Sequence, residues 1–555
     1  MIRRDFIKAS VLAGLYSQLS ACSSSSKQVF SSLERQFDTN RKIAADRVQL
    51  PQGPSLHVSS FGAVGDGKTL NTDILQRALN SAATQGAKLV IDGGQFVTGT
   101  LIIPTNTHLH IEEGAALLGS NNIADYQRSA RGWYTLLSAH KASNISISGG
   151  GKIDGRGRQT ALNIDYMHHS GERPVDNYNS RRMRPHESDR PQIIDFIDCH
   201  QISIFDVTIT NSASWVQTYY HCTDVHIDNI KVVSDAYWNN DGIDFDGVVN
   251  GRISNCFINA ADDAICIKSE QDTQINDSII IEDCIVRSSS NGVKFGTSSY
   301  KGFKNITIRN IHAFDTYRSA VCLGCVDGGY IDNIKIKNIT ATNTGNGFVI
   351  RLGQRYQSAP PGSIRNVTID GLTAQIAFMR ADSSYQLRGP GLNAFFNPIP
   401  ASITGLPDAK VTGITLKNIS LTYPGVANKG LAYIPVSQLF QVPEKRREYP
   451  EYSMFGELPS WALYVRHATG INLKNLKLNE LDSDFRPALV LDDVAKLVIN
   501  DIDIGTSKVH QQLILNDVSG ASVYNVSLQG KLLASGLKLG QTTSVDSDVP
   551  GLMDI

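Results

Sequence analysis

Three aspartates in the middle of the chain are the residues with the clearest potential for chemistry. Asp241 lies in the segment Trp238-Asn-Asn-Asp-Gly-Ile-Asp244, and the adjacent pair Asp262 and Asp263 follows about one structural repeat later. In a stack of parallel strands about 4.8 Å apart, this spacing predicts that the three carboxylates meet. Crowded carboxylates cannot all ionise freely, so at least one keeps a proton at a raised pKa. A protonated acid beside an ionised base is what cleavage of a glycosidic bond requires.

The same residue types also have a purely structural interpretation. Asp-Gly is a common turn pair, and acidic residues in solenoids often cap turns or bind calcium. An isolated Asp-Asp pair would favour that interpretation, but the pattern Asn-x-Asp-Gly-x-Asp one repeat earlier favours a catalytic site. Asp244 and Asp246 are expected to be turn or wall residues.

A short alternating phrase recurs along the chain and predicts the architecture. Apolar and polar residues alternate within it, which is typical of a strand buried on one face. Most intervals are roughly 20–30 residues, the period of one coil of a parallel β-solenoid. Examples of the phrase are Asn144-Ile-Ser-Ile147, Asp224-Val-His-Ile227, Asn305-Ile-Thr-Ile308, Asn333-Ile-Lys-Ile336 and Asn366-Val-Thr-Ile369. The sequence therefore predicts an all-β fold, a right-handed parallel β-helix.

The repeats predict a single catalytic β-helix domain over residues 50–545. Asn71, followed by apolar residues at helical spacing in residues 72–79, predicts a short N-terminal helix that caps the open end of the solenoid. A Pro- and Tyr-rich stretch over about residues 381–461 interrupts the repeats, which resume at Gly470. We expect a long surface excursion there, because long ordered loops on a solenoid often build the binding groove. Such an excursion could also close one end of a groove and enforce exo action.

Residues 1–27 are interpreted as a targeting signal and tether. Ile-Arg3-Arg4-Asp-Phe-Ile-Lys resembles a twin-arginine export motif, and an apolar stretch follows. Leu19-Ser-Ala-Cys22 is similar to a bacterial lipobox, which predicts that Cys22 is lipidated and that the serines after it form a flexible tether. A plain signal peptide is the alternative. The expected localisation is the cell envelope, in the periplasm or at the outer membrane, with the lipid as membrane anchor.

Composition narrows the remaining possibilities. The net charge is −1 at pH 7 and the isoelectric point is about 6.9, so nothing indicates a nucleic-acid partner. Of the 8 cysteines, an odd number remains once Cys22 is lipidated, which argues against a disulfide framework and favours buried small hydrophobes. Cys322-Leu-Gly-Cys325 has no second pair or histidine nearby in sequence, so we expect no metal and no cofactor. We expect a monomer.

Several motifs, in a fixed order, resemble glycoside hydrolase family 28, the polygalacturonases and rhamnogalacturonases. The likeness covers about residues 56–370 and rests on Phe61-Gly-Ala-Val-Gly-Asp-Gly67, Arg190-Pro191, Asn211-Ser212, Asn239-Asn-Asp-Gly-Ile-Asp244 and Asp262-Asp263. It implies that Asp262 is the general acid, that Asp241 and Asp263 orient the attacking water, and that the anomeric configuration inverts. Inverting enzymes usually hold acid and base about 6.5–9.5 Å apart, a separation that stacked strands can supply.

The chain departs from polygalacturonases at two motifs. Their Gly-His-Gly corresponds to the segment around Asn291, and their Arg-Ile-Lys, which holds the galacturonate carboxylate, corresponds to Cys322-Leu-Gly324. Rhamnogalacturonases also lack that histidine. Other residues of the groove are therefore expected to bind the substrate, through charged groups, amides and one stacking aromatic ring. They are Asn239, Lys268, Asn291, Lys294, Arg318, Arg351 and Trp215.

The sequence thus predicts an inverting glycosidase that acts on an acidic polysaccharide (pectin-like, rhamnogalacturonan-like or algal) or on its oligosaccharides. Two alternatives stay open. One is a β-helix polysaccharide lyase that uses calcium bound by carboxylates and a basic residue as proton abstractor. The other is a non-catalytic surface glycan-binding lipoprotein, for which the missing histidine and cations are the main argument.

Overall fold

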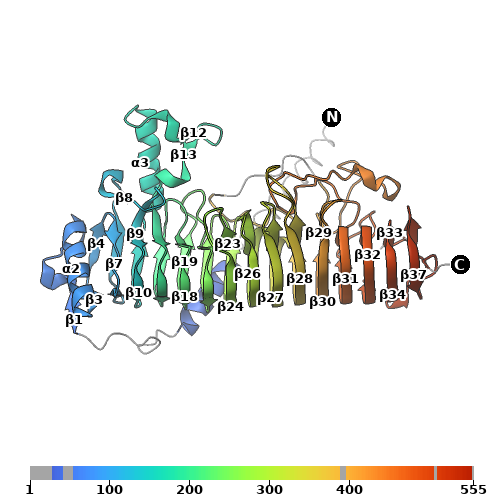
Figure 1. Cartoon of the computed structure of the whole chain (residues 1–555), viewed down its shortest axis with the longest axis horizontal. Helices are drawn as coiled ribbons and strands as arrows, with labels where there is room; N and C mark the ends of the chain where they lie inside the picture. Colours follow the sequence, from blue (N-terminus) through green and yellow to red (C-terminus); the bar gives the residue numbers. More distant parts are fainter. Residues whose placement is uncertain (1–27, 42–53, 388–395, 506–508, 510, 553–555) are drawn as a thin grey trace, which may run out of the picture.

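Parallel strands stack into one long solenoid in the computed structural model of the chain (Figure 1). The structure describes residues 28–41, 54–387, 396–505, 509 and 511–552, so the targeting segment and Cys22 lie outside the described residues. The predicted right-handed parallel β-helix is confirmed. Among the described residues, no helix combines the length and the apolar character that a membrane span needs.

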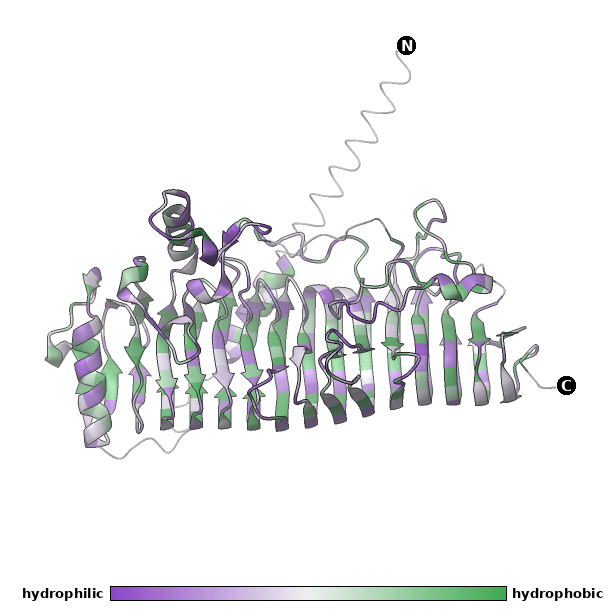
Figure 2. Cartoon of the chain, turned by 45° about the horizontal axis from the view of Figure 1, so that its top comes forward, coloured by the Kyte–Doolittle hydropathy of each residue, from purple (hydrophilic) through white to green (hydrophobic). Residues whose placement is uncertain are grey.

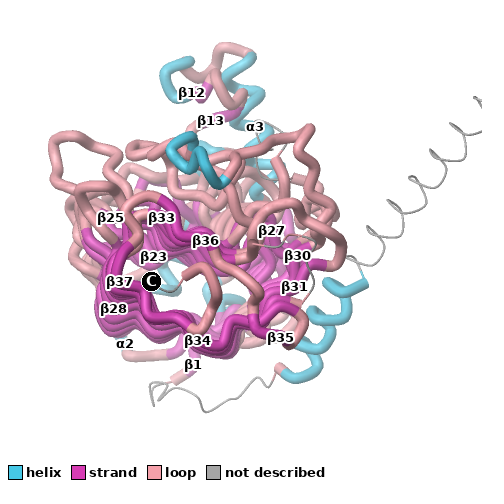
Figure 3. The backbone as a smooth tube through the Cα atoms, turned by 90° about the vertical axis from the view of Figure 1, so that its right-hand side faces the viewer, coloured by secondary structure: helices cyan, strands magenta, loops and turns pink. Residues whose placement is uncertain are grey.

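Each coil contributes strands to three parallel sheets. Figure 3 shows the solenoid end-on, with the coils one behind another and loops gathered along one side. The sheet that carries the functional side chains, called the site sheet, contains β5 (Leu101–Ile102), β9 (Tyr134–His140), β14 (Gln192–Ile197), β17 (Gln217–Tyr220), β20 (Ile243–Asp246), β23 (Ile265–Ser269), β25 (Val293–Ser299), β29 (Ala401–Thr404), β33 (Leu513–Asn516) and β36 (Leu537–Leu539).

The second sheet consists of β1 (Ser55–His57), β3 (Lys88–Ile91), β6 (His108–Ile111), β10 (Ser143–Ser148), β15 (His200–Phe205), β18 (Thr223–Asp228), β21 (Val249–Ser254) and β37 (Thr543–Ser547). The third consists of β2 (Asp66–Leu70), β4 (Gln95–Thr98), β7 (Ala116–Gly119), β11 (Lys152–Asp154), β16 (Thr208–Thr210), β19 (Lys231–Ser234) and β22 (Phe257–Ala260). Long bent strands run through more than one sheet: β24 (Asn276–Ser288), β26 (Phe303–Cys325), β27 (Tyr330–Leu352), β28 (Ser363–Ile376), β30 (Val411–Tyr423), β31 (Leu463–Glu480), β32 (Leu489–Ile504) and β34 (Ser519–Leu528).

Short elements complete the chain. They are the strands β8 (Gln127–Arg128), β12 (Tyr178–Asn179), β13 (Arg184–Pro185) and β35 (Lys531–Leu532), the helices α2 (Thr72–Gln85) and α3 (Gly157–His169), and the 3-10 turns η1 (Val58–Phe61), η2 (Ile123–Asp125), η3 (Val175–Asn177), η4 (Glu187–Asp189) and η5 (Val436–Gln441).

Apolar and polar residues alternate along each strand, and the apolar ones fill the interior of the solenoid. Figure 2 shows the alternation as bands of hydrophobic and hydrophilic residues. Ile145, Ile202 and Val225 share one register on β10, β15 and β18, and all three are buried. Asparagines of the recurring phrase lie at the bends. Asn305 and Asn333 have a φ of 55°, and Asn333 donates from Nδ2 to Oδ1 of Asn305 over 2.8 Å. Asparagine tolerates this left-handed backbone, which explains its recurrence.

The predicted capping helix is present as α2 and is longer than its apolar pattern indicated. Leu75, Ala78 and Leu79 turn inward and are buried against the end of the solenoid. Asn71 precedes the helix but does not cap it with its side chain. Its Oδ1 instead accepts from the backbone of Val64 over 2.8 Å, so it closes the preceding loop.

The stretch expected to be a single excursion is divided by the solenoid itself. Strands β29 and β30 lie within it, because Ser402 continues the ladder between Val349 of β27 and Tyr464 of β31. This leaves a first excursion over residues 377–400 and a second excursion over residues 424–462. The second excursion covers outward-facing positions of the site sheet through a separate apolar cluster. Its members include Leu439, Val442, Tyr452, Phe455 and Leu458, packed against Cys322, Val349, Tyr464, Val490 and Ile514.

A helix over residues 28–40 was not expected from the sequence. Its Phe30 and Phe37 rings lie 6.0 and 5.6 Å from the ring of Phe257 on β22. Lys231 on β19 adds an ion pair to Glu34 over 2.9 Å. The helix is therefore docked on the wall of the solenoid. The seven described cysteines are free and buried, as expected.

Candidate active site

The three aspartates enter the site from loops that precede neighbouring strands of the site sheet. Asp241 precedes β20, and Asp262 and Asp263 precede β23, the next strand of the ladder. One carboxylate oxygen from each of the three lies within 4.8 Å of the others. Spacing by one coil therefore brings these residues together, as the sequence pattern predicts.

Asp263 is held in its ionised form by a dense set of donors. Lys294 Nζ lies 2.8 Å from one carboxylate oxygen, and the backbone and side-chain nitrogens of Asn291 lie 3.0 and 2.8 Å from the other. Burial alone would raise the pKa of Asp263, but the charges of Lys294 and Arg318 outweigh it and hold that pKa below its ordinary value. An ionised carboxylate in such a site can accept a proton.

Asp262 has the opposite environment although it is the adjacent residue. Burial and the neighbouring charge of Asp263 raise the pKa of Asp262 above its ordinary value. It is only partly buried, whereas Asp241 and Asp263 are 4% and 2% exposed. Asp262 therefore combines a raised pKa with access to a ligand, two properties that a general acid needs.

Asp241 shares the ammonium of Lys268, which lies 3.1 Å from its Oδ2. Burial, with the charges of Asp244 and of the other two carboxylates, raises the pKa of Asp241 well above its ordinary value despite Lys268. The other oxygen, Oδ1, is buried and has no hydrogen-bond partner among the described residues. A water molecule that bridges two carboxylates at about 2.8 Å from each fits oxygens up to about 5.5 Å apart, so one water can contact both Asp241 and Asp263.

The usual separation of about 6.5–9.5 Å in inverting enzymes is measured between whole carboxyl groups, so it is a different quantity from the approach of single oxygens. In this site one oxygen from each of the three carboxylates lies within 4.8 Å of the other two. The reason is that all three carboxylates come from the loops at one edge of the sheet, one coil apart, and converge on the same point.

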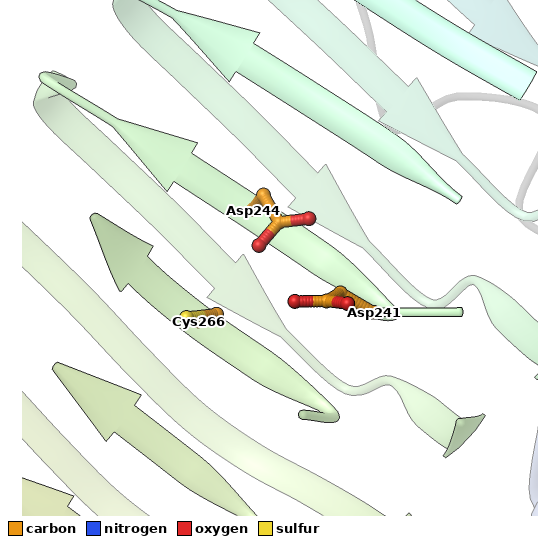
Figure 4. Close-up of side chains that lie close together, drawn as sticks. All are labelled: Asp241, Asp244 and Cys266. Atoms are coloured by element: carbon orange, nitrogen blue, oxygen red, sulfur yellow. The ribbon is translucent and has the colours of Figure 1, made fainter. Parts of the chain in front are cut away.

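A second group of potential ligands lies beside the cluster (Figure 4). Asp241 just before β20, Asp244 on β20 and Cys266 on the adjacent β23 each have a ligand atom within 4.8 Å of the others. Lys268 Nζ lies 2.6 Å from Asp244 Oδ1 as well as beside Asp241, and the thiol of Cys266 donates to the carbonyl of Gly296 over 3.1 Å. The lysine thus supplies the positive charge that a calcium ion would bring, which weakens the case for a calcium-dependent lyase.

The carboxylates lie in a cleft of about 690 Å³. Five of the residues expected to bind substrate line it: Trp215, Asn239, Lys268, Lys294 and Arg318. The indole of Trp215 packs on Trp133, with ring centroids 4.7 Å apart, and Lys268 Nζ lies 3.4 Å from its ring centroid. Asn239 accepts from Arg190 over 2.8 Å, which fixes the loop ahead of Asp241.

Two of the expected substrate-binding residues are placed elsewhere. Asn291 is fully buried behind Asp263 and positions that carboxylate rather than lining the cleft. Arg351 is 1% exposed and donates to the carbonyls of Gly405 over 3.0 Å and Glu444 over 2.8 Å. It therefore anchors the second excursion, because that excursion covers its part of the site sheet.

The sequence did not indicate the residues that close the cleft at its two sides. Arg182, Arg184 and Trp238 form one side. Tyr449 and Glu451 of the second excursion form the other: the Tyr449 hydroxyl is hydrogen-bonded to Lys294, and Glu451 pairs with Arg318 over 3.0 Å. The only signal in the sequence was the Pro- and Tyr-rich composition of the excursion, which does not specify a contact.

Pro450 occupies the position where the family resemblance places Arg-Ile-Lys. Its carbonyl oxygen lies 4.0 Å from the sulfur of Cys322. A Cβ added to Gly324 would lie 3.0 Å from Cγ of Pro450. A long cationic side chain has no room at this position, which gives the departure from the polygalacturonase motif a physical basis.

Comparison with known proteins places the chain in a family. A polygalacturonase-like protein of Vitis vinifera described as "Probable polygalacturonase" is 25% identical over 413 residues, covering 68% of this chain and 76% of the relative. An "Exopolygalacturonase" of Zea mays is 22% identical over 424 residues, covering 68% of this chain and 86% of the relative. The crystal structure of a hyperthermoactive exopolygalacturonase from Thermotoga maritima has the same fold, with a TM-score of 0.53, 22% identity, and coverage of 71% of this chain and 91% of that one.

The match to the family itself includes the whole carboxylate cluster. The profile described as "Glycosyl hydrolases family 28" matches residues 97–376, half of the chain. This range contains all three aspartates and both of the lysines that pair with them, whereas the second excursion follows it. The chain is a glycoside hydrolase, and it belongs to glycosyl hydrolases family 28.

Proposed function

We propose that this enzyme is an exo-acting, inverting glycosidase that removes sugars from the end of a pectin-type polysaccharide or of its oligosaccharides. The observation that carries the proposal is the carboxylate cluster in a cleft with protein walls on both sides. The names of its relatives, polygalacturonases and exopolygalacturonases, support the substrate class.

The roles of the three aspartates follow from their environments. Asp262 donates its proton to the glycosidic oxygen as the bond between that oxygen and the anomeric carbon breaks. A water held by Asp241 and Asp263 attacks the anomeric carbon from the opposite side, and Asp263 accepts the proton that this water releases. The products are a free sugar with inverted configuration and a shortened chain.

Exo action is supported by what flanks the cluster. In Figure 1, α3, β12 and β13 rise on one side of β23, and the loops of the second excursion rise on the other. Arg184 and Trp238 line the cleft on the side of α3, β12 and β13, and Tyr449 and Glu451 line it on the side of the second excursion. The interior of a long polymer would have to pass both walls, whereas a chain end enters between them.

The decisive experiment incubates the enzyme with pectic polysaccharides and oligosaccharides and follows reducing ends and ultraviolet absorbance in parallel. We expect new reducing ends and single sugars without absorbance, since hydrolysis forms no double bond. Asp262→Asn should lose at least a hundredfold in kcat with an unchanged unfolding midpoint, because a general acid contributes about 10²–10⁴. Asp283→Asn is the matched control and should retain activity, because Asp283 is an exposed carboxylate of β24 that accepts from Asn310.

Three results would contradict the proposal. Products that absorb in the ultraviolet and vanish with a chelator would indicate a lyase. Glycan binding without any product would indicate a binding protein. Proton NMR of the first-formed anomer tests inversion directly, and retention would assign a nucleophilic role to one of the carboxylates.

We also propose that the enzyme works in the cell envelope, held by a lipid on Cys22. The proposal is supported by the lipobox pattern and by the helix whose described part, residues 28–40, is docked on the solenoid. Residues 23–27 reach at most about 18 Å when extended, so the anchor would stay near the solenoid wall. Mass spectrometry of the purified mature protein should find a diacylglycerol on Cys22, and an unmodified cysteine would overturn the proposal.

A further inference from the structure

The charges that line the cleft constrain the sugar that it accepts. Five cationic side chains line the cleft, and each already forms an ion pair with a protein carboxylate. Arg182 and Arg184 lie 3.8 and 3.4 Å from Glu187, Lys268 pairs with Asp241 and Asp244, Lys294 lies 2.8 Å from Asp263, and Arg318 lies 3.0 Å from Glu451. Lys268, Lys294 and Arg318, which lie around the three aspartates, are thus committed to protein carboxylates, whereas Arg182 and Arg184 on the opposite wall share the one carboxylate of Glu187.

Acidic groups face the same space. Glu451 remains 30% exposed in its side chain although it pairs with Arg318, and Glu270 also lines the cleft. Pro450, between Tyr449 and Glu451, covers Cys322 and Gly324 and leaves no room for a further cation on that strand. The second excursion thus contributes a hydroxyl, a ring and a carboxylate to this wall, and no positive charge.

We propose that the sugar bound on the non-reducing side of the cleaved bond is uncharged, and that Glu451 excludes uronic acids from this position. The inference rests on the proposed glycosidase function and narrows its substrate class to terminal neutral sugars, with uronic acids allowed only beyond the cleaved bond.

Two physical effects favour the neutral sugar. Beside the second excursion, a uronate carboxylate would lose its hydration without gaining an uncommitted cation on that wall, and it would meet the negative charge of Glu451. A neutral sugar instead offers hydroxyl donors to carboxylates that are already charged, and an apolar ring face to Trp238, which also lines the cleft.

The test uses substrates that differ only in charge. Each is a pectic oligosaccharide that ends either in a uronic acid or in the same sugar after chemical reduction of its carboxyl group, together with oligosaccharides that end in natural neutral sugars. We expect kcat/KM for neutral termini to exceed that for uronate termini at least tenfold. Equal or faster release of uronic acids would overturn the inference.

Glu451→Gln tests the assigned residue, with Glu448→Gln as the matched control. Glu448 belongs to the same excursion, lies outside the cleft and pairs only weakly with Lys445 over 3.5 Å. In Glu451→Gln, the ratio of kcat/KM for neutral termini to kcat/KM for uronate termini should fall at least fivefold, because kcat/KM for the uronate substrates rises. Glu448→Gln should leave this ratio unchanged. An unchanged ratio in Glu451→Gln would remove Glu451 as the selecting residue.

Failure of the inference is distinguishable from failure of the proposed function. If the wild-type enzyme cleaves no oligosaccharide of either kind, the glycosidase proposal fails. The charge preference is then measured by calorimetric binding of the same matched pairs to Asp262→Asn. Tighter binding of the uronate member would overturn the inference, and tighter binding of the neutral member would support it without any turnover.

Discussion

Neighbouring aspartates acquire opposite proton affinities in this site, although they are chemically identical and adjacent in the chain. Asp263 receives an ammonium and two amide donors, whereas Asp262 faces the cleft beside the negative charge of Asp263. The difference comes from Lys294 and Asn291 on the following coil. Environment, rather than residue type, therefore distinguishes the proposed acid from the proposed base.

The pH dependence of catalysis tests the role of Lys294. Because Lys294 and Arg318 lower the pKa of Asp263, this base should stay ionised, and the enzyme active, at a pH below the ordinary range of an aspartate. Lys294→Met removes the nearest positive charge, so the pKa of Asp263 should rise. We expect the acidic limb of kcat/KM to move at least one unit toward higher pH.

The measurement is the pH profile of kcat/KM for both proteins, within the range in which circular dichroism shows them folded. The basic limb reports the proton on Asp262 and should also move toward higher pH, because Lys294 lowers the pKa of Asp262 as well. An acidic limb at the same pH in Lys294→Met would contradict the assignment of Asp263 as the base.

At the scale of elements, the second excursion distinguishes this solenoid from a plain stack of coils. It packs through its own apolar cluster on the site sheet, so it forms a fixed wall of the cleft. Arg351 ties the excursion to the sheet through the carbonyls of Glu444 and Lys445, and its guanidinium lies 5.1 Å from the ring of Phe455. The wall should therefore depend on Arg351 without any contact between Arg351 and the substrate.

Arg351→Met is expected to loosen the second excursion. The substitution leaves buried carbonyls without their donor, which costs about 1–3 kcal/mol for each unsatisfied group. Hydrogen exchange should become faster over residues 442–456, and internal cuts should appear in the products from a long polymer. Arg365→Met, which removes an exposed ion pair to Asp332, should change neither property. Unchanged exchange in Arg351→Met would show that the apolar cluster alone holds the wall.

At the scale of the whole molecule, stability is shared by coils that contact only their neighbours. Ile281, Ile308, Ile336 and Ile369 occupy one register on four consecutive strands and are fully buried. A substitution that disrupts the core of one coil weakens its packing against both neighbouring coils, as expected for a repeat architecture. The active site lies on coils of this same continuous ladder, so it inherits their rigidity.

Ile308→Ala should lower the free energy of unfolding by about 2–5 kcal/mol, because it leaves a cavity in the packed column. Thr307→Ala, on the same strand but only partly buried, should change it by less than about 0.5 kcal/mol. Both values are read from urea denaturation followed by circular dichroism. Equal effects of the two substitutions would contradict the account of a single inward-facing column.

Local patterns in the sequence were sufficient to predict the architecture and the convergence of the three carboxylates. Period-two alternation, left-handed asparagines and coil-length spacing act between neighbouring coils, so they can be read without knowledge of distant contacts. The same regularity aligned Asp241 with Asp262 and Asp263. The resemblance to the family supplied the roles of these residues, and the family itself was then shown.

Only the tertiary structure decided what surrounds the carboxylates. Tyr449 reaches Lys294 across 155 positions of the chain, and no periodicity links the two residues. The same packing removed Arg351 from the cleft, and it placed Pro450 over the strand where cations would be expected from the family. A loop outside the repeat is positioned by its apolar contacts with the finished solenoid, which do not exist until the solenoid has formed.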